Sequence, residues 1–278
     1  MKQQTNKPAN QGEPGDLLVP RFAGSDQPLI LASGSPRRRQ LLARLGLPFR
    51  VVVPDLDEDV PSSSGLTPDQ MAEALARAKA LTVAQRERDG LVLAADTLVV
   101  DGETVLGKPR DAAEATAMLR RLRDREHRVI TSVALLDAAR PGPPSGIQSR
   151  FRPPPSGGGI DAAAFRLRSH KLSEVAFGLA HHVATTVRMR PYTDEEIAAY
   201  VARGEPFDKA GAYAIQDQAF HPVASYDAVP AGRQGCYCNV VGFPLRAVVR
   251  LLRQAGLDIT DSHLAGLPPE CENCPIPS

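Results

Sequence analysis

The sequence has almost no excess of charge of either sign. Of its 278 residues, 33 are Lys or Arg and 32 are Asp or Glu, which leaves a formal charge of +1. A surface without a one-signed field gives no reason to expect a nucleic acid or an anionic membrane as partner. Any anion that this protein binds must therefore be held by a local group of side chains.

Long apolar runs are also lacking. No stretch approaches the roughly 20 apolar residues that span a bilayer. The first residues, MKQQTNKPANQGEPGD, contain no apolar segment of the signal-peptide type. We therefore expect a cytoplasmic protein.

Cysteine is scarce and falls in two close pairs, C-Y-C at Cys236 and Cys238 and C-E-N-C at Cys271 and Cys274. Four cysteines are too few for a disulfide framework in a chain of this length, so reduced thiols are the first interpretation. The two pairs could close a tetrahedral Zn²⁺ site, although the first is one residue tighter than the usual spacing. Against zinc, we expect the second pair to lie in a frayed C-terminal tail.

Composition divides the chain into one domain and three irregular segments. Residues 1–27, rich in Pro, Gly, Asn and Gln, predict a disordered tail, and residues 259–278 predict another tail. Residues 28–258 predict the domain, and a Pro/Gly-rich insertion interrupts it at about 138–182.

Within the domain, strand and helix patterns alternate, which predicts an α/β fold. Before the insertion we expect strands at 29–32, 49–53, 91–100 and 128–136, helices from Pro36, at 67–84 and at 111–123, and a hairpin after Asp101. After it we expect a strand at 184–191 and a helix at 193–204. The stretch NVVGFPLRAVVRLLRQAGL reads as the end of a strand followed by an amphipathic helix.

The stretch SGSPRRR predicts an anion site at the start of a helix. Ser35 is a good N-cap and Pro36 suits the first helical position. Arg37 and Arg38 would then lie beside a phosphate at the positive end of the helix dipole. The competing interpretation is a solvated, charged helix face. Neither G-x-x-x-x-G-K-[ST] nor G-x-G-x-x-G is present.

Acidic residues follow two apolar runs. Asp96 and Thr97 come after the apolar residues LVLAA, and PDLDED, which contains Glu58, comes after the second strand. Ligands gather at strand carboxyl ends in open α/β sheets, and two carboxylates there could hold Mg²⁺. Read separately, Asp96 and Thr97 could simply form a turn, and PDLDED could be an exposed loop.

Three further residues are weak candidates when each is taken alone. Lys79 and Lys108 could supply fixed cations, although lone lysines usually face solvent. In FDKAGAYAIQ, Gly211 marks a turn before an expected short strand, and the amide of Gln216 could bind a base edge.

Taken together, these motifs resemble one family, the Maf-like nucleoside triphosphate pyrophosphatases. The resemblance covers Leu29 to Gly256 apart from the insertion, and it rests on motifs in a fixed order: SGSPRRR, LDE, ARAKA, AADT, GKPRD, HRVIT, TTVRMRP, DKAGAYAIQ and NVVGFPL. It implies a mixed twisted sheet with helices, in two lobes around a central cleft, related to the inosine triphosphate pyrophosphatases and often homodimeric. The implied activity is hydrolysis of a nucleoside triphosphate to its monophosphate and pyrophosphate with Mg²⁺ or Mn²⁺.

The resemblance also assigns roles residue by residue. Asp96 matches the proposed proton acceptor and Glu58 the second catalytic carboxylate, and both would hold the metal. The positions around the phosphates are matched by Ser33, Arg37, Arg38, Lys79 and Lys108. Arg37, Thr97 and Gln216 match the positions that are linked to substrate choice in the dTTP/UTP branch of the family.

Two alternatives remain open. The branch that acts on 7-methyl-GTP tends to have an aromatic residue in place of the first arginine and S-D-Q in place of A-D-T. A regulator linked to cell division that binds nucleotide without catalysis would have no use for acidic residues beside the arginines. The insertion, both tails and the cysteine-containing stretches depart from the family pattern, but none falls on a matched site residue.

Overall fold

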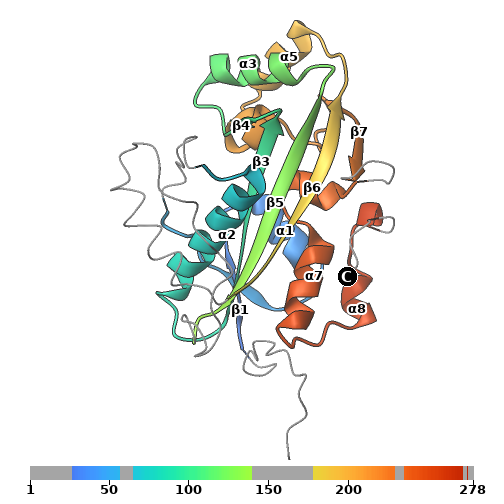
Figure 1. The fold of residues 1–278 in the computed structure, drawn as a ribbon. Helices are drawn as coiled ribbons and strands as arrows, with labels where there is room; N and C mark the ends of the chain where they lie inside the picture. The colour runs from blue at the N-terminus through green and yellow to red at the C-terminus, as the bar shows by residue number, and fades with distance from the viewer. Residues whose placement is uncertain (1–26, 57–64, 140–177, 229–234, 272–273, 275–278) are drawn as a thin grey trace, which may run out of the picture.

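The computed structural model describes residues 27–56, 65–139, 178–228, 235–271 and 274. Its centre is a seven-stranded mixed sheet in the order β2-β1-β3-β5-β6-β7, with β4 paired to β3 (Figure 1). Strand β1 is parallel to β2 and β3, and all other pairs are antiparallel. The strands are β1 Leu29–Ala32, β2 Phe49–Val51, β3 Leu91–Asp101, β4 Thr104–Leu106, β5 Glu126–Asp137, β6 Gly178–Met189 and β7 Val223–Ala228.

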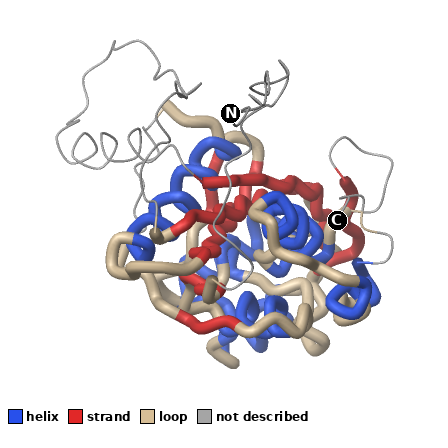
Figure 2. The backbone as a smooth tube through the Cα atoms, turned by 90° about the horizontal axis from the view of Figure 1, so that it is seen from below, coloured by secondary structure: helices blue, strands red, loops and turns tan. Residues whose placement is uncertain are grey.

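Helices lie on both sides of the strands (Figure 2). The α-helices are α1 Pro36–Ala43, α2 Pro68–Ala84, α3 Ala112–Leu122, α5 Asp194–Ala202, α6 Tyr237–Val241, α7 Leu245–Gln254 and α8 Asp261–Leu264. Short 3-10 helices are η1 Glu205–Asp208, η2 Ala210–Ala212 and η3 Pro269–Cys271. None of the helices in the described part of the chain is both long and apolar enough to cross a membrane.

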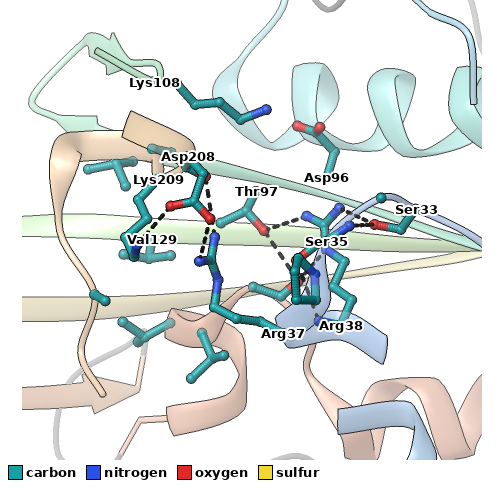
Figure 3. A pocket seen from close by; sticks show the side chains of 18 of the residues that line it. Ser33, Ser35, Arg37, Arg38, Asp96, Thr97, Lys108, Val129, Asp208 and Lys209 are labelled. Carbon is teal, nitrogen blue, oxygen red and sulfur yellow. Dashed lines mark hydrogen bonds and ion pairs between the residues drawn. The ribbon is translucent and has the colours of Figure 1, made fainter. Parts of the chain in front are cut away.

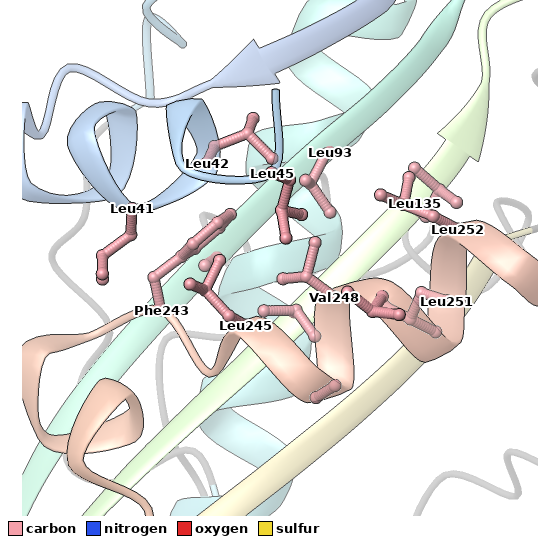
Figure 4. Packing of buried hydrophobic residues seen from close by; sticks show 14 of the residues in the cluster. Leu41, Leu42, Leu45, Leu93, Leu135, Phe243, Leu245, Val248, Leu251 and Leu252 are labelled. Atoms are coloured by element: carbon pink, nitrogen blue, oxygen red, sulfur yellow. The ribbon is translucent and has the colours of Figure 1, made fainter. Parts of the chain in front are cut away.

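Alternation along β1 divides the core between the two faces of the sheet. Leu29 and Leu31 pack with α1 and α7, whereas Ile30 and Ala32 pack with α2. The first cluster is the larger, and α7 fills it with Leu245, Val248, Leu251 and Leu252 against Leu93 and Leu135 of the sheet (Figure 4). This packing fixes α1 and β1, which carry the arginine motif.

A separate cluster covers the far ends of β3 and β5. There α3 and α5 pack through Leu119, Ile197 and Tyr200 against Val99 and Val129. Figure 1 shows α3 and α5 at one end of the long strands and α2 and α7 along the rest of them. The architecture confirms a mixed α/β sheet with helices arranged in two lobes.

Capping residues mark the starts of three helices, and the cap at Ser35 confirms the prediction from the sequence. Ser35, Thr67 and Thr193 each accept a hydrogen bond from a backbone N–H in the first turn of α1, α2 and α5. Pro36 occupies the first turn of α1. These side chains satisfy amide groups that have no partner within the helix.

Several expectations about secondary structure are wrong. Residues 237–241 form α6 rather than the end of a strand, and residues 213–216 form no strand. Strand β6 begins at Gly178, inside the expected insertion, and β7 was not expected at all. Short apolar runs such as NVV suit a buried helix as well as a strand, so tertiary packing decides between them.

The expectation of a frayed C-terminal tail is also wrong for the residues that the structure describes there. Helix α8 and η3 continue the fold past residue 258, and Ile259 and Cys271 are buried in the same cluster as α7. Local composition gave no sign of these long-range contacts.

Candidate active site

The arginine motif begins where β1 ends. Ala32, the last residue of β1, pairs with Ala94 of β3, so β3 continues beyond its neighbour. Asp96 and Thr97 therefore lie in the middle of β3, not at its end as the sequence suggested. They are nevertheless just past the carboxyl end of β1, where the chain turns through Gly34 into α1 and leaves room for a ligand.

A pocket of about 330 Å³ occupies this space. Every predicted site residue that the structure describes lines it: Ser33, Arg37, Arg38, Lys79, Asp96, Thr97, Lys108 and Gln216. Glu58 lies outside the described residues. Asp55, from the same acidic motif, does not line the pocket, and its carboxylate pairs at the surface with Arg86 at 3.4 Å.

A buried ion pair lies at the base of the pocket. The Nζ of Lys79, on α2, is 2.5 Å from Oδ1 of Asp96, on β3, and the two side chains are 5% and 8% exposed. A carboxylate this deeply buried would be costly without a compensating charge. Lys79 is thus a partner of the buried acid in this structure, in addition to its predicted place near the phosphates.

Arg38 donates hydrogen bonds to three separate segments of the chain. Its Nε donates to the carbonyl of Gly242 after α6 at 2.9 Å, and its guanidinium also donates to Thr97 Oγ1 at 3.2 Å and Ser33 Oγ at 3.4 Å (Figure 3). Gly242 has φ +105°, and a Cβ there would come within 3.0 Å of Thr97 Oγ1. A larger residue at position 242 would therefore be strained and would press on this contact.

The network continues into the sheet through Thr131 and Asn239. The hydroxyls of Thr97 and Thr131 are 3.0 Å apart, and Thr131 donates to the carbonyl of Asn239 at 3.0 Å. The buried Asn239 amide accepts from Thr131 N at 3.1 Å and donates to Val129 O and Thr185 Oγ1, each at 2.9 Å. Sequence reasoning missed Asn239 as a site residue, although it opens the motif NVVGFPL.

Arg37 faces the other side of the pocket. Its guanidinium donates to Asp208 Oδ2 at 2.8 Å and to the Asp208 carbonyl at 3.3 Å, so α1 is joined to η1 across the pocket (Figure 3). Lys209 Nζ lies 2.7 Å from Asp208 Oδ1. Partial burial acts to raise the pKa of Asp208, but the hydrogen bond from Lys209 and the charge of Arg37 outweigh it and lower the pKa. Asp208 was not predicted as a site residue, although it begins the motif DKAGAYAIQ.

Lys108 reaches the pocket from the segment after β4. Figure 3 shows its ammonium group and the Asp96 carboxylate directed toward the same space. Gly107 anchors this segment, because its carbonyl accepts from Gly211 N of η2 at 3.0 Å. Gln216 lines the pocket from the stretch after η2.

The chemistry of the donors fits a hard divalent cation only in part. No group of three or more His, Cys, Asp or Glu side chains among the described pocket residues is arranged to hold a metal. Asp96 does offer a carboxylate oxygen, the type that Mg²⁺ prefers, and Mg²⁺ usually takes only one or two protein carboxylates with water and phosphate. Asp96, with Glu58 as the predicted second ligand, is compatible with that mode of binding.

Comparison with known proteins identifies the family. Residues 28–151 and 163–255 match the family described as Maf-like protein. The chain belongs to this family. The resemblance seen in the motifs is thereby confirmed.

Three similar proteins carry the same name. A protein of Thermomicrobium roseum named dTTP/UTP pyrophosphatase is 45% identical over 89% of this chain and 93% of its own length. Proteins of the same name from Pelotomaculum thermopropionicum and Moorella thermoacetica are 40% and 43% identical, each over 83% of this chain, and over 98% and 96% of their own lengths. The chain thus spans nearly the whole of these relatives.

Among solved structures, a nucleoside-triphosphatase described as a dITP/XTP pyrophosphatase from Mycobacterium abscessus matches with 14% identity and a TM-score of 0.30. The match covers 59% of this chain and 74% of that one.

Proposed function

We propose that this protein is a pyrophosphatase that hydrolyses dTTP and UTP to the monophosphate and pyrophosphate. The observation that carries the proposal is the pocket itself, where the buried Asp96 carboxylate faces the same space as Arg37, Arg38 and Lys108. The name of the relatives, dTTP/UTP pyrophosphatase, supports the choice of substrate. A role in clearing unwanted or modified pyrimidine nucleotides would follow.

The proposed chemistry is attack of water on the α-phosphorus. Asp96 accepts a proton from the water, a new P–O bond forms, and the bond to the bridging oxygen breaks so that pyrophosphate leaves. Arg37, Arg38 and Lys108 hold the phosphate oxygens and offset the charge that develops on the leaving group. Lys79 holds Asp96 in place.

Asp96 and Glu58 would hold a divalent cation, Mg²⁺ or Mn²⁺, which when bound neutralises phosphate charge. For selectivity, we propose that Gln216 and Thr97, with Arg37, favour a pyrimidine ring. Gln216 carries both an amide donor and an acceptor, so it can pair with the donor and acceptor edge of uracil or thymine. Because nucleoside triphosphates are abundant in the cytoplasm, we propose that the enzyme acts there.

The test is a panel of nucleotides. Purified protein is incubated with dTTP, UTP, CTP, GTP and 7-methyl-GTP in the presence of Mg²⁺ or Mn²⁺, and pyrophosphate and monophosphate are measured. We expect turnover of dTTP and UTP, and a fall in kcat of about 10³-fold in Asp96→Asn, since the proton acceptor is removed.

Asp101→Asn is the matched control. Asp101 lies on the same strand but pairs with Arg121 at 2.6 Å, away from the pocket, so kcat should be unchanged. Binding without turnover would favour the nucleotide-binding regulator, and preference for 7-methyl-GTP would assign the chain to the other branch. Full activity in Asp96→Asn would refute the mechanism.

A further inference from the structure

The four cysteines, separated in sequence, come together in the fold. Cys236 caps the start of α6, Cys238 lies within α6, Cys271 ends η3 and Cys274 follows it. The Sγ atoms of Cys238 and Cys271 are 3.2 Å apart. Cys236 has Cys274 as its hydrogen-bonding neighbour, and Cys274 also interacts electrostatically with Cys238 and Cys271. We call these four residues the cysteine cluster.

The cysteine cluster is enclosed by the fold. Cys236, Cys238 and Cys271 are at most 1% exposed, and Cys274 is partly buried. All four are free thiols rather than disulfides. Cys236, Cys238 and Cys271 belong to the hydrophobic cluster that contains α7, where a buried cysteine can act as a small apolar side chain. Four convergent thiols are also the donor set of a structural zinc site.

The sulfur atoms are not yet spread as ligands of a metal, and the described residues contain no group already arranged for one. Two thiolates on one tetrahedral zinc, each about 2.3 Å from the metal, lie about 3.8 Å apart. The 3.2 Å between Cys238 and Cys271 must therefore widen by about half an ångström. A disulfide needs a contraction to about 2.05 Å, roughly twice that movement.

We propose that the cysteine cluster binds one Zn²⁺ ion, as a structural site separate from the catalytic pocket. Binding releases the thiol protons and leaves a site of net charge −2, formed by four thiolates and one dication. Arg246 can offset part of that charge, since it acts electrostatically on Cys271 and its Nε donates to the Cys271 carbonyl at 2.9 Å. Glu270 opposes it.

The position of the cluster gives the zinc a consequence for the pocket. Cys236 is the N-cap of α6, and Cys238 and Asn239 lie within this helix. The carbonyl of Asn239 accepts a hydrogen bond from Thr131, and the carbonyl of Gly242, which follows the helix, accepts one from Arg38. Zinc would tie the segment after α8 to this helix. The site would therefore stabilise the wall of the pocket without contacting substrate.

The experiment measures zinc in the full-length protein. Protein purified under reducing conditions from medium supplemented with zinc is analysed for metal content, then stripped with a chelator and titrated with Zn²⁺ and with Co²⁺. We expect one zinc per chain, the visible absorption bands of a tetrahedral Co²⁺-thiolate site, and a rise in the melting temperature when zinc is returned.

Variants test the ligands. Cys238→Ser and Cys271→Ser should lose the zinc, and because such buried substitutions can prevent folding, Cys274→Ser, the least buried, is the decisive variant. We expect it to fold, to bind zinc at least tenfold more weakly and to lose the zinc-dependent rise in melting temperature. Glu270→Gln is the matched control, since it alters a neighbouring charge and no ligand, and it should keep one zinc.

Three results would overturn the proposal. They are a parent protein without zinc and without the cobalt spectrum, a parent protein whose mass shows two disulfides under the same reducing conditions, and equal zinc binding by parent and Cys274→Ser. None of them bears on dTTP hydrolysis, so the zinc site and the proposed activity are tested separately.

Discussion

Arg37 and Arg38 are adjacent in sequence, yet the structure holds them in different ways. Arg38 donates to oxygens of Gly242, Thr97 and Ser33, which belong to α6's end, β3 and the β1–α1 turn. Arg37 instead pairs with the carboxylate of Asp208, whose side chain is 58% exposed. The first arginine of the helix thus bridges the pocket, and the second is fixed along one wall.

Arg38 is therefore a hydrogen-bond donor held in a fixed orientation, whereas Arg37 is a donor that can exchange its partner. Neutral oxygens on three elements orient Arg38 before any substrate arrives, which is the arrangement that electrostatic catalysis requires. The pair between Arg37 and Asp208 is partly exposed, and such pairs contribute only about 0–1 kcal/mol. A phosphate of the substrate can therefore replace Asp208 as the partner of Arg37 at little cost.

Among variants of the two arginines and their partners, the largest effect is expected from Arg38→Ala. It removes a preoriented donor and leaves the oxygens around it without their partner, so kcat/KM for dTTP should fall about 10²–10³-fold. Arg39→Ala, which alters the exposed neighbour on the same helix, is the control and should retain parental kinetics. If the two variants behaved alike, Arg38 would be no more than a surface charge.

Arg37→Ala should have a smaller effect, about 10- to 100-fold in kcat/KM and mainly through KM. The reason is that a hydrogen bond to a charged group contributes about 1.5–3 kcal/mol. Arg37→Lys keeps the charge but not the planar fork, and it should recover part of the loss. Steady-state kinetics with dTTP, UTP and CTP also show whether Arg37 affects the choice of base. Effects as large as those of Arg38→Ala would contradict the division between the two arginines.

Thr131→Val tests whether the hydrogen-bond network positions Arg38. The substitution keeps the shape of the side chain but removes the hydroxyl between Thr97 and Asn239, so we expect a destabilisation of about 1–2 kcal/mol. With Arg38 less firmly held, KM should rise about threefold to tenfold. Thr116→Val on α3, which removes an exposed hydroxyl bonded only to its own helix, is the control. Chemical unfolding and steady-state kinetics measure both effects.

The smallest effect is expected from Asp208→Asn. Freed from its carboxylate partner, Arg37 should bind phosphate more readily, so KM should fall about twofold to threefold, in line with an ion pair of this exposure. Asp124→Asn, which alters an exposed carboxylate paired with Arg188 at 3.4 Å, should leave KM unchanged. In Arg37→Ala, the added Asp208→Asn should have no further effect on KM.

The same pair has a defined pH dependence. Because the pKa of Asp208 lies below its ordinary 3.8, the ionised form is favoured by folding. Its contribution to stability is present above that ordinary value and is lost as pH falls through the folded pKa. The difference in unfolding free energy between parent and Asp208→Asn should therefore be fully present at pH 7 and should shrink as the pH falls below 3.8 and through the folded pKa.

Local signals carried most of what could be predicted. The cap at Ser35 and the proline at 36 placed the start of α1, and the order of the motifs placed distant residues such as Lys79, Lys108 and Gln216 in one pocket. These features depend on hydrogen bonds within a few residues or on a pattern shared across a family. The catalytic and binding roles of the residues stay predictions that the experiments above test.

The rest depended on contacts between distant segments. Asn239 is bonded to Val129, Thr131 and Thr185, all more than 50 positions away, and only those contacts distinguish it from a surface amide. The cysteine pairs likewise meet across a separation of 33 residues. The sequence left open whether the two cysteine pairs meet, and no periodicity or cap decides such long-range contacts, so the three-dimensional structure is needed to establish them.

The position of Asp96 in the middle of β3 has a consequence for local unfolding of the protein. Residues 91–100 of β3 are paired continuously with β5, and Asp96 lies opposite Ser132 within that ladder. Most reactive groups sit on loops that open at low cost, whereas a central strand opens only when the whole domain does. The backbone amides around Asp96 should therefore be among the last to exchange with heavy water. Loss of activity on heating should then coincide with global melting instead of preceding it.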